Sequence, residues 1–104
     1  MSVPITELAK VIRSKNAGPF ELTLDIIFKD KNSYELVKDK GCINKELISR
    51  LYKISQEDIV SIIYFDPARA VKITLIRPIP AGSPGERDVY GAQQHAPLLN
   101  IEIQ

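Results

Sequence analysis

Alternation of apolar and polar residues is the feature that most constrains how this chain folds. Residues 21–28 carry an apolar residue at every second position, and most positions between them are polar. Successive side chains of a β-strand point to opposite faces, so this pattern predicts a strand with one buried face. The positions on that face are Leu22, Leu24, Ile26 and Phe28.

Three further segments have strand character. Residues 70–76 alternate in the same way, and residues 98–103 form a last alternating stretch. Residues 59–65 are dense in isoleucine, valine and aromatic residues, which predicts a strand in the centre of the sheet. The break at Asp66 and Pro67 between two such segments predicts a hairpin.

The middle of the chain changes to a helical pattern. Asn32 or Ser33 is predicted to cap a helix that ends at Gly41. Asn44 is predicted to cap a second helix, and the polar stretch 55–58 to introduce the next strand. The apolar face of the second helix consists of Leu47, Ile48, Leu51 and Tyr52.

The N-terminal residues 5–12 fit two patterns. Leu8, Val11 and Ile12 share a helical face, but the segment also alternates and has β-branched residues at both ends. The residues of this segment alone therefore leave both helix and strand open.

The predicted order of elements is strand, strand, helix, helix, strand, strand, loop, strand. A few antiparallel strands with helices packed on one face form an α+β fold, and we predict a ferredoxin-like sandwich with a mostly antiparallel sheet. With 104 residues and no internal repeat, the chain (1–104) is expected to form a single domain.

The segment 78–97 interrupts this regular pattern. It contains four prolines and three glycines, and so long a connection without regular structure is uncommon in a compact domain. Apolar residues such as Val89 and Tyr90 lie among polar ones, which favours an ordered C-terminal arm. An arm across a subunit interface, a lid over a site and a mobile tail are the three alternatives.

Charge and composition narrow the classes of partner. Lys and Arg number 14 and Asp and Glu 13, so the net charge of +1 gives no overall field to attract nucleic acid. One cysteine, Cys42, and one histidine, His95, provide neither a disulfide nor metal-ligand spacing, and we predict no metal and no cofactor. No apolar run approaches the roughly 20 residues that cross a membrane, and no signal peptide is evident, which predicts a cytoplasmic protein.

Arg13, Ser14, Lys15 and Asn16 are candidate ligand-binding residues. They fall in a predicted turn with Gly18, where two cations, a hydroxyl and an amide can present donors to a carboxylate or phosphate. Arg13 would supply a bidentate fork and Lys15 a point charge. The alternative is a solvated hairpin loop in which Asn16 and Gly18 serve only turn geometry.

His95 is the candidate catalytic residue, because histidine can act as a general acid or base near neutrality. Gln93 and Gln94 beside it are candidates for binding and orienting a substrate. The alternative is a histidine that forms hydrogen bonds at an interface. Asp66 is either a catalytic carboxylate at a strand end or, with Pro67, a turn residue.

Four stretches of the sequence resemble a known family. They are residues 13–21, 65–68, 77–80 and 88–98, the last of which reads Asp-Val-Tyr-Gly-Ala-Gln-Gln-His-Ala-Pro-Leu. On these stretches the chain resembles, over essentially its whole length, a family of small bacterial proteins of similar length that is catalogued as a domain of unknown function. The family itself carries no established activity.

Arg13 and Ser14 open a motif that resembles part of the C-terminal ferredoxin-like domain of acyclic terpene utilisation protein A. That domain reads Arg-Ser-Gly-Asp-Lys-Gly-Asp after a short strand. Here Lys15 is shifted relative to its lysine, and Asn16 is the nearest polar residue to its acids. The resemblance implies a strand over residues 5–12.

Members of the resembling family tend to be encoded beside proteins similar to acyclic terpene utilisation protein A. This implies a small accessory subunit of such a large protein, which acts on an unsaturated or hydroxy carboxylic acid or its CoA thioester. Arg13 and Lys15 would hold the carboxylate, and His95 with Gln94 would orient the reacting part or the partner. The alternatives are a stand-alone homo-oligomeric binding or structural module, and a small hydratase or isomerase that uses His95.

Overall fold

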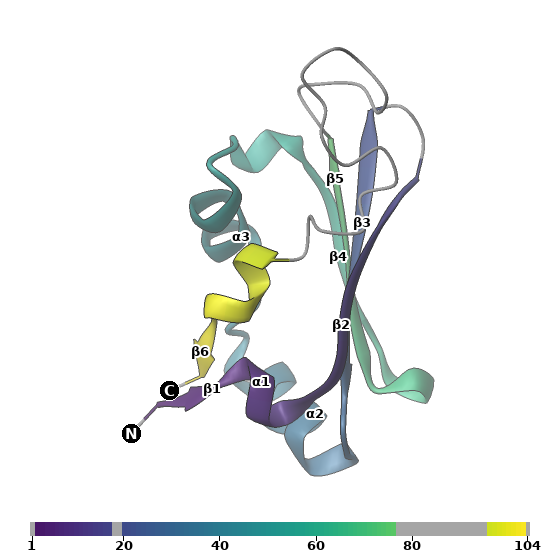
Figure 1. Ribbon diagram of the computed structural model, residues 1–104, viewed down its shortest axis with the longest axis vertical. Coiled ribbons are helices and arrows are strands. Elements are labelled where there is room, and N and C mark those ends of the chain that lie inside the picture. Colours follow the sequence, from purple (N-terminus) through teal and green to yellow (C-terminus); the bar gives the residue numbers. More distant parts are fainter. Residues whose placement is uncertain (1, 18–19, 77–95, 104) are drawn as a thin grey trace.

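The computed structural model describes residues 2–17, 20–76 and 96–103 of the chain. The main sheet has four antiparallel strands in the order β2-β3-β5-β4, and a second, small sheet pairs β1 with β6 (Figure 1). The strands are β1 (Val3–Pro4), β2 (Ala9–Asn16), β3 (Glu21–Phe28), β4 (Ile59–Phe65), β5 (Ala70–Ile76) and β6 (Glu102–Ile103).

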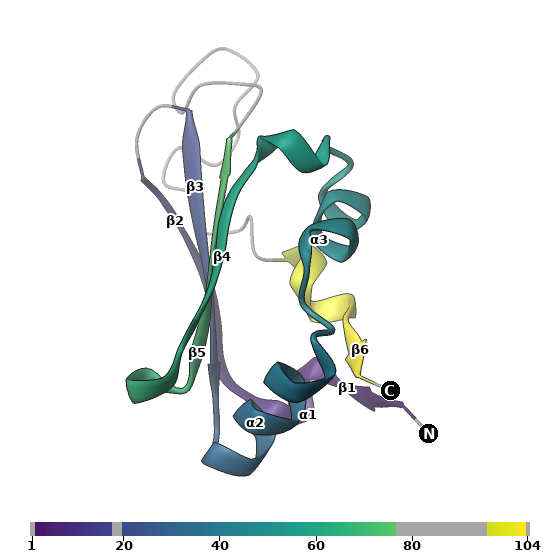
Figure 2. The ribbon, with the colours of Figure 1, turned by 180° about the vertical axis from the view of Figure 1, so that it is seen from behind.

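The helices α1 (Ile5–Leu8), α2 (Lys31–Lys40) and α3 (Lys45–Tyr52) lie on one side of the main sheet. The 3-10 helix Ala96–Asn100 and the small sheet lie on the same side, as the view from behind also shows (Figure 2). The described residues leave the opposite face of the main sheet uncovered. We call the first face the covered face and the second the open face.

One apolar core fills the space between the covered face and the helices. β3 and β5 supply alternate residues to it, which confirms the alternation predicted for both segments. The helices and the C-terminal segment close the core from the other side with Ile5, Val37, Ile48 and Leu98, none of which is exposed. The strand residues are Leu22, Leu24, Ile26, Phe28, Val71, Ile73 and Leu75, each at most 3% exposed.

Helix α2 begins two or three residues earlier than the sequence pattern predicts. Asp30, rather than Asn32 or Ser33, is its N-cap, because the Asp30 carboxylate accepts a hydrogen bond from the Ser33 backbone N–H at 2.7 Å. Gly41 ends the helix as predicted, in a left-handed conformation with φ of 61° that favours glycine.

Helix α3 confirms the predicted cap. The Asn44 side chain accepts a hydrogen bond from the Leu47 backbone N–H at 2.9 Å. Ile48 is fully buried, and its apolar neighbours on the same helical face pack against the core. A 3-10 helix, Gln56–Asp58, then leads directly into β4, so the polar stretch introduces a strand as predicted.

The hairpin predicted at Asp66 and Pro67 is present. β4 and β5 are antiparallel, and a 3-10 turn, Asp66–Ala68, connects them. Arg69 closes the turn in a left-handed conformation with φ of 53°. Asp66 is therefore a turn residue, which is one of its two predicted roles.

Two strand predictions are wrong in part. β4 is an edge strand of the described sheet rather than a central one. It has apolar residues on both faces, a pattern typical of a strand buried on both sides, but Ile63 and Phe65 are half exposed on the open face. Of residues 98–103, only Glu102–Ile103 is a strand, because the preceding residues form a 3-10 helix.

The N-terminal segment is helix and strand in succession. Ile5–Leu8 forms one helical turn that buries its first and last residues, and β2 follows from Ala9. The strand predicted for residues 5–12 is therefore correct only from Ala9 onward. The helical pattern of this segment reflects the turn Ile5–Leu8, and the alternating pattern reflects the start of β2.

The α+β class and the antiparallel sheet are confirmed. A ferredoxin-like fold follows the order β-α-β-β-α-β. Here β1 pairs with β6 in a separate sheet, so the ferredoxin-like assignment is not confirmed. Most of the predicted arm at 78–97 lies outside the described residues.

Candidate functional site

Three charged side chains stand side by side across three strands of the open face. In the strand register, Arg13 of β2 pairs with Asp25 of β3, and Asp25 pairs with Lys72 of β5. Residues that pair directly across antiparallel strands project from the same face, so the register alone brings these side chains together. We call Arg13, Asp25 and Lys72 the charged row.

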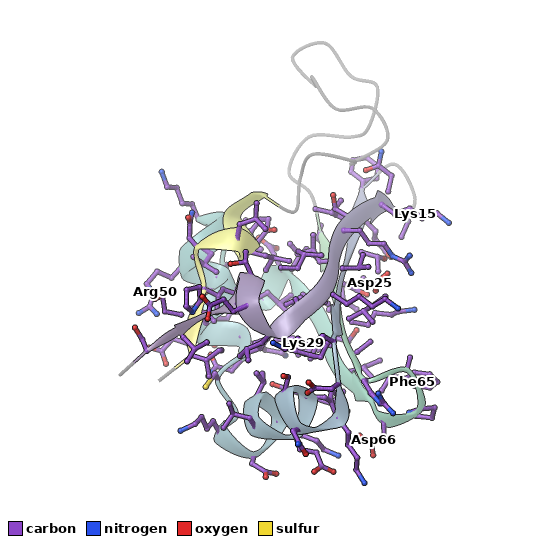
Figure 3. All side chains as sticks on the ribbon, turned by 60° about the horizontal axis from the view of Figure 1, so that its bottom comes forward. Lys15, Asp25, Lys29, Arg50, Phe65 and Asp66 are labelled. Atoms are coloured by element: carbon purple, nitrogen blue, oxygen red, sulfur yellow. The ribbon has the colours of Figure 1, made fainter. Side chains whose placement is uncertain are left out.

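Asp25 is the centre of the charged row. Its Oδ2 accepts a hydrogen bond from Arg13 Nε at 3.2 Å, and its side chain is 18% exposed whereas that of Arg13 is 63% exposed. The other carboxylate oxygen, Oδ1, is buried and has no hydrogen-bond partner in the described part of the chain. Figure 3 shows Asp25 and Lys15 on the same side of the sheet, away from the helices.

A shallow cavity of about 850 Å³ lies over this part of β2, β3 and β5. Arg13, Lys15 and Lys72 provide three positive charges to it, and Asp25 provides one negative charge. Neither lysine forms an ion pair within the described residues. The cavity is lined by Arg13, Ser14, Lys15, Asn16, Ala17, Thr23, Asp25 and Lys72.

The excess of cations suits one kind of ligand group. A carboxylate or phosphate gains charge-assisted hydrogen bonds from lysine and arginine. The Thr23 hydroxyl at the same cavity can donate a further hydrogen bond. The chemistry that this arrangement can perform is to bind and orient an anionic group.

The predicted ligand-binding residues lie in a strand, not in a turn. β2 continues to Asn16, so the turn predicted from Arg13 onward is wrong. Strand alternation also divides the four residues. Arg13 and Lys15 share the open face, whereas Ser14 and Asn16 pair with the core residues Leu24 and Leu22. All four still line the cavity.

His95, Gln93 and Gln94 lie outside the described residues, as does Gly18. Their roles, and the meeting of the 13–18 and 88–95 stretches at one site, stay predictions.

Residues 5–102 match the family described as Domain of unknown function (DUF4387). The chain belongs to the DUF4387 family. No curated protein and no solved structure matches it. The family assignment confirms the predicted membership in a domain-of-unknown-function family.

Sequence reasoning missed three residues of the site in this DUF4387 chain. Thr23, Asp25 and Lys72 are the polar members of alternating strands, so their exposure was predictable from periodicity. The side chains that lie beside them could not be predicted, because strand order and register cannot be derived from separate segments of the sequence. The signal for Asp25 and Lys72 was a single charge in the middle of each strand.

A second group of polar side chains joins α2 to the β4–β5 hairpin. Asp66 Oδ1 accepts hydrogen bonds from the Tyr34 hydroxyl at 2.5 Å and from Lys38 Nζ at 2.9 Å. Burial, reinforced by the Asp66 contact, raises the pKa of Tyr34, so this phenol stays protonated and acts as a donor. The hydrogen bonds from Tyr34 and then Lys38 lower the pKa of Asp66 below 3.8.

The cavity beside Asp66, of about 640 Å³, does not resemble the first one electrostatically. Three cations and three acids line it, so its net charge is balanced, and Asp66 already accepts two hydrogen bonds. The contacts of Asp66 fasten the hairpin to α2, and the cavity has no excess charge for a ligand. The charged residues are Lys31, Lys38, Arg69, Glu35, Asp39 and Asp66.

Within residues 2–17, 20–76 and 96–103, no three His, Cys, Asp or Glu side chains cluster closely enough to hold a metal ion. Cys42 is half-buried and forms no disulfide. In the same part of the chain, no helix has the length and apolarity needed to cross a membrane.

Proposed function

We propose that this chain is a small cytoplasmic accessory subunit that partners a large acyclic-terpene-utilisation-type protein. The large protein acts on an unsaturated or hydroxy carboxylic acid or its CoA thioester. The small subunit replaces or complements the ferredoxin-like C-terminal domain of such a protein, and its charged row with Lys15 holds the ligand's carboxylate.

The observation that carries this proposal is the excess of cations at one open cavity. Within the described residues Arg13 uses its Nε for Asp25, so its other guanidinium N–H groups, together with Lys15 and Lys72, are available to an incoming anion. Lys72 pairs in register with Asp25, and Lys15 lies one row away on β2, so the two lysines stand on either side of β3. Their placement on strands rather than loops favours a defined geometry for that group.

An apolar strip beside the charged row supports a ligand with a hydrocarbon part. The next row of the open face runs from Val11 through Ile27 and Ala70 to Phe65. Ala70 lies two residues from Lys72 along β5, so a carboxylate held at Lys72 lies one row, about 7 Å, from an apolar surface. That arrangement matches an unsaturated acid better than a free inorganic anion.

The openness of the cavity supports a subunit rather than a complete enzyme. The described residues leave the charged row on a sheet face without a covering layer (Figure 3). Binding sites for small molecules bury most of the ligand surface, and one sheet face cannot do so alone. A second protein surface that closes over the row would complete the site.

Co-expression with the large neighbouring protein, followed by size-exclusion chromatography, tests the partnership. The proposal expects the two chains to elute together in a constant ratio. A small chain that elutes alone beside a folded large chain would contradict it and favour the stand-alone homo-oligomeric module.

Ligand binding is tested on the same complex with 2-hexenoate as the probe carboxylate. Arg13→Ala and Lys72→Ala should each weaken binding about tenfold, a loss of about 1.4 kcal/mol, close to the lower end of the range for hydrogen bonds to charged groups. Lys45→Ala, an exposed lysine on α3, is the matched control and should leave binding unchanged. Equal loss of assembly in the row variants would instead assign the row to the subunit interface.

His95→Ala tests the third alternative, a small hydratase or isomerase. If the chain is a small hydratase or isomerase that uses His95, this variant should abolish turnover by the isolated small chain. Under the accessory-subunit proposal, the isolated chain has no turnover to lose, and the variant lowers the activity of the complex.

A further inference from the structure

We propose that the outer edge of β4 is a dimerisation edge, along which a second copy of this chain adds its own β4 in antiparallel pairing. Two four-stranded sheets would thereby become one continuous sheet. This inference does not depend on the proposed function, because it rests on the strand edge and not on the cavity.

The two edges of the main sheet differ in how they resist strand addition. β2, at one edge, carries the exposed cations Lys10, Arg13 and Lys15 and has a register irregularity near its start. Charged side chains and bulges on an edge strand are the devices by which proteins block edge-to-edge pairing. The β2 edge is therefore protected.

The β4 edge lacks charged protection. Residues 59–65 contain no charged residue and no proline. Val60, Ile63 and Phe65 are 52%, 50% and 52% exposed, respectively. An exposed apolar edge strand of this kind is a template for pairing with another strand. Its one irregularity lies near Val60, which leaves the stretch from Ser61 to Phe65 in regular register with β5.

The backbone of β4 favours a strand as the partner. In the described part of the chain, residues 60–64 have no backbone hydrogen bond outside the sheet ladder, whereas the Ile59 N–H donates to the Gln56 oxygen of the preceding 3-10 helix. The outward-facing N–H and C=O groups of an edge strand need partners, and an added strand satisfies them in a single row.

β4 is also held in a fixed orientation. The Tyr64 hydroxyl donates a hydrogen bond to the Ile43 backbone oxygen at 3.0 Å, which anchors the strand on its covered side. Ile63 and Phe65 consequently project to the open face, where Figure 3 shows Phe65. A prearranged strand loses little entropy when a second strand joins it.

The composition of β4 favours a second copy of the same strand. Around a two-fold axis, an antiparallel strand meets its own sequence, so any charge on it would approach others of its kind. Because residues 59–65 are uncharged, this pairing brings no like charges together within the strand.

The residues flanking the strand select one register. If Ile62 lay at the two-fold axis, Asp58 of one copy would stand opposite Asp66 of the other, which places two acids together. If Ile63 lies at the axis, Ile63 meets its counterpart and Phe65 meets Ser61. Ile63 is also the middle residue of the regular stretch from Ser61 to Phe65, so an axis there pairs the whole stretch with its counterpart, and we assign the axis to Ile63.

This dimer would join the open faces of both copies. A two-fold axis perpendicular to the sheet keeps the helices of both copies on the same side. In each copy, Lys72 at the end of the charged row pairs with Ile63 of β4. The two Lys72 residues would then be separated by three strand spacings, about 14 Å, on one continuous face.

The mass of the full chain in solution tests the inference. Light scattering after size exclusion should give twice the monomer mass of 11.7 kDa. Ile63→Lys should give a monomer with an unchanged circular dichroism spectrum. Ile76→Lys, which places the same charge on the same face but on an internal strand, should remain a dimer.

Disulfide trapping gives a second readout that does not rely on a disruptive substitution. In a Cys42→Ser background, Ile63→Cys should form a covalent dimer when an oxidant such as diamide is added, because residues at the axis lie within disulfide distance. Ile76→Cys should not. A wild-type chain that is monomeric at about 100 µM, far above the dissociation constant of a specific dimer, would overturn the inference. So would a dimer that survives Ile63→Lys and is not trapped through Ile63→Cys.

Discussion

The two faces of the main sheet are made by the same strands but follow different rules. On the covered face, Leu24, Ile26 and Ile73 have no exposed surface and belong to one apolar core. On the open face, the residues between them form rows of charge, hydroxyls and apolar side chains. The comparison indicates that apolar packing on the covered face provides most of the stability. The side chains of the open face are therefore free to serve binding.

Adjacent residues of β5 give the largest test of this difference. Ile73 is fully buried, whereas its neighbour Thr74 lies on the open face. Ile73→Ala should lower the free energy of unfolding by about 2–5 kcal/mol, through lost transfer energy and a residual cavity. Thr74→Ala should lower it by at most about 1 kcal/mol, the range of strand propensity. Urea denaturation of both variants measures the contrast.

Similar losses for the two variants would break the comparison. They would mean that another layer packs on the open face, so that Thr74 is buried in the protein in solution. The dimer proposed above predicts no such layer, because it extends the sheet sideways.

The next effect concerns the contact between the helical layer and the end of the sheet. Tyr34→Phe removes the hydroxyl that donates to Asp66 but keeps the ring that packs against Phe28 and Tyr64. The expected loss is about 1 kcal/mol of unfolding free energy, the usual net value of one hydrogen bond. Lys38→Met removes the second donor to Asp66 and, because Lys38 is 43% exposed, should cost less. If Lys38→Met costs more, the cation rather than the phenol holds the hairpin.

The same contact predicts a pH dependence. Hydrogen bonds from Tyr34 and Lys38 keep the pKa of Asp66 below its ordinary value of 3.8. The stabilisation is therefore complete above pH 3.8 and is lost as the pH falls through the lower, folded-state pKa. The difference in unfolding free energy between wild type and Asp66→Asn should shrink between pH 5 and the acid limit, on the order of pH 2.

Asp39→Asn is the control for this pH dependence. Asp39 lies on α2 and makes no hydrogen bond or ion pair within the described residues. This variant removes a charge from α2 but no acceptor of the hairpin contact, so a pH dependence that appears only in Asp66→Asn belongs to that contact. A difference between wild type and Asp66→Asn that is constant with pH would show that Asp66 is not held by these donors in solution.

Local patterns predicted most of the fold, and long-range pairings explain what was missed. Alternation in residues 21–28 and 70–76 identified the core strands because their periodicity reports burial directly. The edge position of β4 was missed because apolar residues on both faces also describe a central strand. The 3-10 helix at Ala96–Asn100 was missed because Leu99, Ile101 and Ile103 alternate as in a strand, whereas in the structure Leu98 and Ile101, three residues apart, are buried and Leu99 is exposed.

The candidate site was predictable only in part for the same reason. Arg13 and Lys15 were recognised as cations near a glycine, but their neighbours Asp25 and Lys72 belong to strands distant in sequence. Register, which no single segment encodes, decides that they meet. Strand alternation sends Ser14 and Asn16 to the opposite face, and this was missed because these residues were assigned to a turn instead of to β2.

The smallest effects on stability are expected in the charged row itself, where they best separate binding from folding. Arg13 is largely exposed, so Arg13→Ala should change the unfolding free energy by less than about 1 kcal/mol. Asp25→Asn should also be tolerated, because the amide oxygen can still accept from Arg13.

Binding of 2-hexenoate by the complex should respond to these two changes in opposite directions. Removing Arg13 takes away a cation and weakens binding, whereas Asp25→Asn removes the only acid among the described residues that line the cavity. A like charge about 4 Å from a bound carboxylate opposes it by about 1 kcal/mol in water, so Asp25→Asn should tighten binding about fivefold. Weaker binding by Asp25→Asn would mean that Asp25 positions Arg13 for the ligand, since loss of the charged partner would then outweigh the relief of repulsion.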